Sequence, residues 1–159
     1  MGVYDVAQIC LNGHVVNDSV RRSPQHNQKH CDKCGAATIV ECPNCKTPIH
    51  GDYYVEGFLG GHEIPAPAFC HECGKAYPWT ETQIQAAKEL AQELELPAED
   101  QEVLAKSIED IVSDTPRTAL GATRFKKIMA KVGKEGAAGF RTILTSVVSE
   151  AAKKIIWPV

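Results

Sequence analysis

The 159-residue sequence lacks long hydrophobic runs, because charged or polar residues interrupt every apolar stretch well before membrane-spanning length. A membrane-spanning helix needs roughly 20 consecutive, mostly apolar residues, so we expect no such helix. The first ten residues contain neither the basic start nor the apolar centre of a secretory signal. These absences favour a cytoplasmic protein.

The sequence also lacks the short motifs that mark common catalytic sites. It contains no Gly-x-Ser-x-Gly, the motif that carries the nucleophile of many hydrolases. Gly133-Lys134-Glu135 lacks the Ser or Thr and the upstream glycine of a phosphate-binding loop. We therefore predict that the protein is not an enzyme.

The seven cysteines cannot all form disulfides with one another, because their number is odd. A reducing compartment also disfavours disulfides and leaves thiols available as metal ligands. Adding His14 to the seven cysteines gives eight soft or borderline ligands, which fill two tetrahedral zinc sites. The sequence thus predicts two Zn²⁺ ions per chain.

The eight candidate ligands occur as four closely spaced pairs. One Cys-x-x-x-His pair precedes three Cys-x-x-Cys pairs, and together they are Cys10, His14, Cys31, Cys34, Cys42, Cys45, Cys70 and Cys73. Two complete sets of four leave no open position for a catalytic water, so we expect structural zinc. We expect the other histidines to be surface residues or neighbours of ligands: His26, His30, His50, His62 and His71.

The spacing leaves open which pairs share a metal. Sequential pairing joins the first pair to the second and the third to the fourth, across spacers of 16 and 24 residues that can each form a hairpin. A crossed arrangement joins first to third, and a nested one joins first to fourth. The seven-residue spacer between Cys34 and Cys42 also suits a short ribbon, which keeps the nested option open. Sequential pairing is favoured.

This half of the chain resembles the zinc-ribbon superfamily and, more narrowly, a bacterial double-zinc-ribbon family of unknown function. The likeness rests on Cys-x-Asn-Gly-His at residues 10–14, on the Cys-x-x-Cys-Gly knuckles and on Cys-Gly-Lys-Ala-Tyr-Pro-Trp-Thr at residues 73–80. The resemblance implies a small β module held together by metal, and it implies no activity.

The remainder of the chain has helical periodicity. Apolar residues recur at helical spacing within 80–95, 97–113, 116–132 and 140–157, with breaks at Pro97, Pro116 and Gly133. Thr80 and Gln83 suggest a capping box at the first helix. We predict an α+β protein: a double zinc-ribbon module over 1–79 and a bundle of about four helices over 80–159.

The charges divide into regions of opposite sign. Residues 1–79 carry a formal charge of −2, residues 80–114 carry −8 and residues 115–159 carry +7. We expect a zinc-binding adaptor that contacts another protein or a second copy through the helical region. One alternative is nucleic-acid binding by the basic residues of 115–134. Another is membrane-surface binding by an amphipathic helix over 140–157. The competing interpretation is that the apolar face of this helix is buried in the core of the helical bundle.

Overall fold

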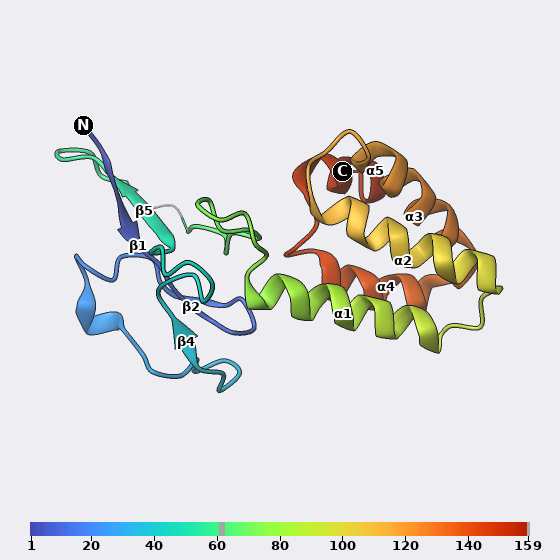
Figure 1. The fold of residues 1–159 in the computed structure, drawn as a ribbon, viewed down its shortest axis with the longest axis horizontal. Helices are drawn as coiled ribbons and strands as arrows, with labels where there is room; N and C mark the ends of the chain where they lie inside the picture. Colours follow the sequence, from blue (N-terminus) through green and yellow to red (C-terminus); the bar gives the residue numbers. More distant parts are fainter. Residues whose placement is uncertain (61–62, 159) are drawn as a thin grey trace. The chain divides into compact units, whose positions relative to one another are not determined.

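The computed structural model describes residues 1–60 and 63–158 (Figure 1). The chain divides into two compact units, Met1–Glu81 and Thr82–Val159. We call them the ribbon unit and the helical unit. The ribbon unit contains small β-sheets and the helical unit contains only helices, so the α+β class predicted from sequence is confirmed. That the regions 1–79 and 80–159 fold as separate domains stays a prediction.

The ribbon unit is built from five short strands in two antiparallel sheets. One sheet pairs β1 with β5, and the other has the order β3-β2-β4. The strands are β1 (Val3–Val6), β2 (Gln8–Cys10), β3 (Val15–Asn17), β4 (Thr38–Ile39) and β5 (His50–Tyr54), and a 3₁₀ turn, η1 (Pro24–His26), follows β3. The stretch Tyr4–Ile9 contributes to two strands with different partners. The pairing of β1 with β5 extends to Ala7, whose N–H donates to the Ile49 carbonyl, and β2 then pairs with β3 and β4.

The apolar core of the ribbon unit is small. It comprises Ala7, Ile9, Ile49, Tyr77 and Trp79, together with the first cysteines of two pairs. The Tyr77 and Trp79 rings stack with centroids 4.7 Å apart, and the Trp79 indole N–H donates to the Pro67 carbonyl at 2.8 Å. A core of this size supplies little hydrophobic stabilisation, so the unit needs another source of stability.

The described residues contain more helices than the sequence indicated, and the first helix begins in the last residues of the ribbon unit. The helices are α1 (Pro78–Glu93), α2 (Ala98–Val112), α3 (Thr118–Val132), α4 (Lys134–Leu144) and α5 (Glu150–Ile156). The expected helix over 140–157 is wrong, because the chain turns between Leu144 and Ser149. Ser149 donates its N–H to the Ile111 carbonyl, and its side chain accepts from the Ala152 N–H. Ser149 is therefore the N-cap of a new helix, and residues 1–60 and 63–158 contain five α-helices, not four.

The expected capping box at Thr80 is also wrong. Helix α1 begins at Pro78, which suits a first helical position because proline has no N–H to leave unpaired. Thr80 lies inside the helix, fully buried, and its hydroxyl donates to the Ala68 carbonyl at 2.8 Å. This residue ties the start of α1 to the segment that leads into the last cysteine pair.

One continuous core joins helices of the helical unit. Phe125 of α3 and Phe140 of α4 pack edge to face, with ring centroids 5.8 Å apart, and neither is exposed. The apolar residues of the C-terminal segment belong to this core: Phe140, Leu144, Val147, Val148, Ala152 and Ile156. The structure therefore supports the interpretation that the apolar residues of 140–157 form part of the bundle core. Within the described residues no helix has the length and apolar character to cross a membrane.

Candidate metal centres

The three Cys-x-x-Cys segments fold into the same backbone turn. In each, the first cysteine donates its N–H to the carbonyl five residues later, and its own carbonyl accepts the N–H four residues later. The first bond is 2.8 Å long in all three segments, from Cys31 to Ala36, Cys42 to Thr47 and Cys70 to Lys75. This turn places both thiols of a pair on the same side of the chain, which is the arrangement of a zinc knuckle.

The Cys10–His14 segment forms a tighter turn between β2 and β3. The Gly13 N–H donates to the Cys10 carbonyl at 2.9 Å, and Cys10 in turn donates to the His14 carbonyl at 3.0 Å. Gly13 has φ +90°, a conformation that side chains disfavour, and an added Cβ would lie 3.1 Å from the Trp79 Cβ. The turn therefore requires glycine, and it brings the His14 ring back to the Cys10 sulfur.

The first group unites Cys10, His14, Cys31 and Cys34, whose ligand atoms all lie within 4.8 Å of one another. The Cys10 sulfur lies 3.5 Å from His14 Nδ1 and 3.7 Å from the Cys34 sulfur. The Cys31 sulfur lies 3.6 Å from the same His14 nitrogen. These are the first and second pairs in sequence.

The second group unites Cys42, Cys45, Cys70 and Cys73 within the same 4.8 Å limit. The sulfurs of Cys42 and Cys73 are 3.8 Å apart, and those of Cys45 and Cys70 are 3.6 Å apart. The side chains therefore assemble as sequential pairs, and neither the crossed nor the nested arrangement occurs.

These spacings fit a tetrahedral ion better than any direct bond between the side chains. A disulfide needs a sulfur–sulfur distance of about 2.05 Å, so the closest sulfur pairs are not disulfides. Zinc with Zn–S of about 2.3 Å and Zn–N of about 2.0–2.1 Å would hold tetrahedral sulfurs about 3.8 Å apart and a sulfur–nitrogen pair about 3.5–3.6 Å apart. The donor set and its geometry thus fit a metal ion in each group.

Hydrogen-bond donors around the sulfurs stabilise the thiolate form that a metal requires. The Ala36 N–H and the Asn12 side-chain amide, 3.3 Å away, lower the pKa of the exposed Cys34 thiol to about 6. The N–H groups of Cys73 and Glu72 likewise lower the pKa of Cys70 to about 6. At Cys10, by contrast, burial raises the pKa of the thiol. The contribution of Asn12 was not predicted, although its place inside the Cys-x-Asn-Gly-His turn could have indicated it.

A buried hydroxyl beside the second group points to the same chemistry. Tyr77 is 1% exposed, and its hydroxyl has no hydrogen-bond partner in the described part of the chain. Burial, and then the negative charge of Cys70, raise the pKa of this phenol, so it stays protonated and able to donate. A buried donor without an acceptor is unfavourable. A metal-bound thiolate at Cys70 would provide that acceptor, and sequence reasoning gave no indication of this role.

Two of the remaining histidines link the Cys70–Cys73 knuckle to the β1–β5 sheet. The His71 ring stacks on His50 with centroids 3.7 Å apart, and His50 stacks on Tyr4 at 4.0 Å. All three side chains are exposed, as are His26 and His30, which agrees with the expected surface positions. His62 lies outside the described residues.

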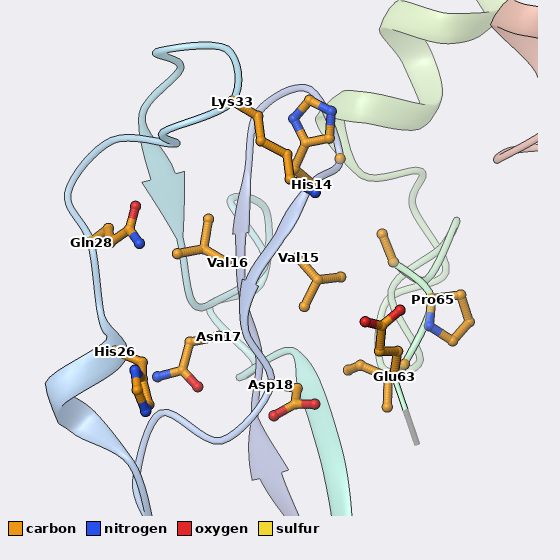
Figure 2. Close-up of a pocket in the computed structure, with 13 residues that line it drawn as sticks. His14, Val15, Val16, Asn17, Asp18, His26, Gln28, Lys33, Glu63 and Pro65 are labelled. Atoms are coloured by element: carbon orange, nitrogen blue, oxygen red, sulfur yellow. The ribbon is translucent and has the colours of Figure 1, made fainter. Parts of the chain in front are cut away.

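An open groove of about 610 Å³ lies beside the first group (Figure 2). β3 forms its floor, Glu63 and Pro65 lie along one side, and His26 and Gln28 lie along the other. Lys33 lies beside His14 at one end of the groove. Its lining mixes acidic, basic and apolar side chains and contains no cluster with a single chemical character.

The Cys42–Cys45 knuckle departs from the other two knuckles at one backbone position, and this yields a testable prediction. Lys46 has φ +64°, where the equivalent Gly35 and Gly74 have φ +76° and +75°. A left-handed conformation costs a side-chain-bearing residue about 1–2 kcal/mol. Lys46 is exposed, and none of the ion pairs among residues 1–60 and 63–158 involves its side chain. We expect Lys46→Gly to stabilise the metal-loaded ribbon unit by about 1 kcal/mol.

Thermal denaturation of the metal-loaded protein would measure the effect of Lys46→Gly. Gly35→Lys is the matched reverse change and should destabilise the unit by a similar amount. A Lys46→Gly variant that melts at a lower temperature than the parent would contradict the strain argument.

Fold and clusters together define a protein with zinc-ribbon-like Cys/His sites on small β-sheets, followed by a helical region. A family model described as "Uncharacterized protein conserved in bacteria (DUF2321)" matches residues 3–156, and the chain belongs to this family. The match also covers the helical unit, whereas the sequence motifs that resemble a known family all lie within residues 10–80. No curated protein matches the chain, and no solved structure does.

Proposed function

We propose that each Cys/His group holds one structural Zn²⁺ ion and that the protein is a non-enzymatic adaptor. The observation that carries the first part is the pair of four-ligand groups with tetrahedral spacing. Thiolate-rich sets of this kind are typical of zinc in proteins. A full set of four protein ligands leaves no position for a reactive water, which supports a structural role over catalysis.

The adaptor role follows from what the metals would do to the surface. Two Zn²⁺ ions and seven thiolates would change the formal charge of residues 1–79 from −2 to about −5, with neutral histidines. A charge of this sign repels a phosphate backbone, so the ribbon unit is a poor nucleic-acid surface. It would serve instead as a rigid platform for another protein in the cytoplasm.

Two ion pairs in the helical unit weigh against the nucleic-acid alternative. Arg117 pairs with Asp110 and Lys131 pairs with Asp100, both at 3.1 Å, so these two cations already have acidic partners. The membrane alternative is weaker because the apolar residues of 140–157 that it would need are largely buried in the helical core. Neither alternative has a specific observation in its favour.

The metal count tests the first part of the proposal. We expect two zinc ions per chain by elemental analysis of the purified protein. Cys10→Ser and Cys42→Ser should each leave one zinc, because each removes a buried ligand from a different group. His71→Ala is the matched control, since His71 lies between two ligands but outside both groups, and it should keep two. One zinc or none in the parent protein would refute the ligand assignment.

A further inference from the structure

Exposed apolar side chains gather at one end of the ribbon unit, on the β1–β5 sheet and the turn after it. Val3, Tyr4, Tyr53, Tyr54, Phe58 and Leu59 are exposed, and we call them the tip patch. Phe58 is 72% exposed and Leu59 is 102% exposed. Figure 1 shows β1 and β5 side by side, with the turn that follows β5 near the start of β1. Clustered apolar exposure of this kind marks interaction surfaces, whereas isolated residues such as Leu120 of α3 are common on any surface.

The backbone holds the tip patch outward. The Phe58 N–H donates to the Val55 carbonyl at 3.1 Å, and Gly57 has φ +82°, which a type II turn requires at this position. This hydrogen bond closes the turn directly before the two most exposed residues of the patch, Phe58 and Leu59.

A shallow hollow of about 160 Å³ lies within the patch, bordered by Tyr53, Tyr54, Phe58 and Leu59. Arg22 borders it as well, but its charge is already neutralised. Its guanidinium donates to Asp5 and Asp52 at 3.1 and 2.7 Å and lies over the Tyr54 ring at 4.3 Å. The hollow thus has aromatic side chains in its lining and is of a size to accept an aliphatic side chain.

The charged residues near the tip patch favour a positively charged partner. Residues 47–74 contain no Lys or Arg, and the exposed Glu56 lies inside the tip turn. Glu56 has no ion-pair partner among the salt bridges of the described residues. The net negative charge of a zinc-loaded ribbon unit would likewise attract cations and repel anions. An anionic membrane is repelled by such a surface, whereas a basic protein segment is attracted.

We propose that the tip patch binds an apolar segment of another protein that carries Lys or Arg beside its apolar residues. One aliphatic side chain of that segment occupies the hollow, and a cationic side chain pairs with Glu56. The proposal rests on the adaptor function and names the surface and the partner chemistry that the adaptor uses.

Synthetic peptides provide the test, with the full-length zinc-loaded protein and fluorescence anisotropy as the readout. The probe is a short labelled peptide of alternating Leu and Lys. Alternating Leu and Glu removes the charge match, and alternating Ser and Lys removes the apolar residues. We expect the Leu–Lys peptide to bind at least tenfold more tightly than either counterpart.

Substitutions in and beside the tip patch would show where the Leu–Lys peptide binds. Phe58→Ser combined with Leu59→Ser should weaken binding of the Leu–Lys peptide at least tenfold, and Glu56→Lys should weaken it severalfold. Leu120→Ser is the matched control, because it removes an exposed leucine from the helical unit, and it should bind the peptide like the parent. Both serine variants should keep two zincs, because none of these residues lies in a ligand group.

Five results would overturn the proposal. Three concern the peptides: no binding of the Leu–Lys peptide, equal binding of all three peptides, or unchanged binding by the Phe58/Leu59 variant. The fourth is self-association in sedimentation that this variant abolishes, which would assign the patch to a second copy. The fifth is flotation of the parent, but not the variant, with anionic vesicles, which would assign the patch to a membrane. Two zincs without peptide binding would refute the patch alone, whereas absent zinc would refute the metal assignment.

Discussion

A chelator is expected to unfold the ribbon unit while the helical unit remains folded. The ribbon unit has a core of a few residues, and structural zinc in small domains contributes roughly 10–16 kcal/mol of apparent binding free energy. The helical unit has its own core around Leu104, Phe125 and Phe140, and no Cys/His group lies in its described residues. Removing metal therefore takes stability from only one of the two units.

Hydrogen exchange of the full-length protein, resolved by peptide, would measure this difference. With excess chelator, peptides from residues 3–54 should lose protection, while peptides from α2 and α3 should keep it. Added zinc should restore the first set. Phe125→Ala is the complementary control: loss of a buried aromatic costs about 3–5 kcal/mol, so it should weaken protection in the helices and leave the zinc count at two. Protection of the ribbon unit that survives chelation would contradict a structural role for the metals.

Replacing the buried carboxylate of Asp5 is expected to destabilise the ribbon unit by several kcal/mol, although Asp5 is not a metal ligand. Asp5 is 5% exposed and accepts from the Val6 N–H at 2.6 Å and the Arg21 N–H at 2.9 Å, as well as from the Arg22 backbone and side chain. Asp5→Asn keeps the shape but points an amide N–H at one of these donors. Leaving buried donors without an acceptor costs about 1–3 kcal/mol each, so we expect a loss of about 2–4 kcal/mol.

The pH dependence of this effect has a defined sign. Burial acts to raise the pKa of Asp5, but the N–H groups of Arg21, Val6 and Arg22 outweigh it and lower the pKa below 3.8. A carboxyl with a lowered pKa contributes stability above its unfolded-state pKa and loses it as the pH falls through the folded-state value. The difference in unfolding free energy between parent and Asp5→Asn should therefore stay constant from about pH 5.5 to 8.

Asp52→Asn provides the matched comparison, measured by denaturant unfolding of the zinc-loaded proteins. Asp52 bonds the same guanidinium, but both side chains of that pair are partly exposed, so its loss should cost about 1 kcal/mol or less. An Asp5→Asn variant no less stable than Asp52→Asn would show that Asp5 does not organise the sheet. A difference between parent and Asp5→Asn that changes between pH 5.5 and 8 would assign the effect to another group.

The ligand pairs were readable from the sequence because the knuckle is a local structure. Its two cysteines are three residues apart, and the backbone hydrogen bonds that shape it lie within six residues, as from Cys31 to Ala36. The breaks at Pro97 and Gly133 were readable for the same reason, since backbone chemistry at one residue ends a helix.

The helix break at Ser149 shows where local reasoning fails. The apolar spacing of 140–157 suits one helix, but the Ser149 N–H bonds the Ile111 carbonyl, which belongs to α2. Thr80 is a second case, because its hydroxyl bonds a carbonyl twelve residues earlier instead of capping its own helix. In both, a contact distant in sequence outweighs a local preference of about 1 kcal/mol.

The sequence by itself determined the number of ligands, their arrangement in four pairs, and the division into a cysteine-rich and a helical region. Residue type and short spacing are sufficient for these features, because they depend on backbone turns and on ligand chemistry. Only the tertiary structure decided which pairs meet, that Tyr77 lies beside the Cys70 group, and that Phe58 and Leu59 remain exposed. These depend on which distant segments pack together, and the free energy of that packing is distributed over contacts that no short segment contains.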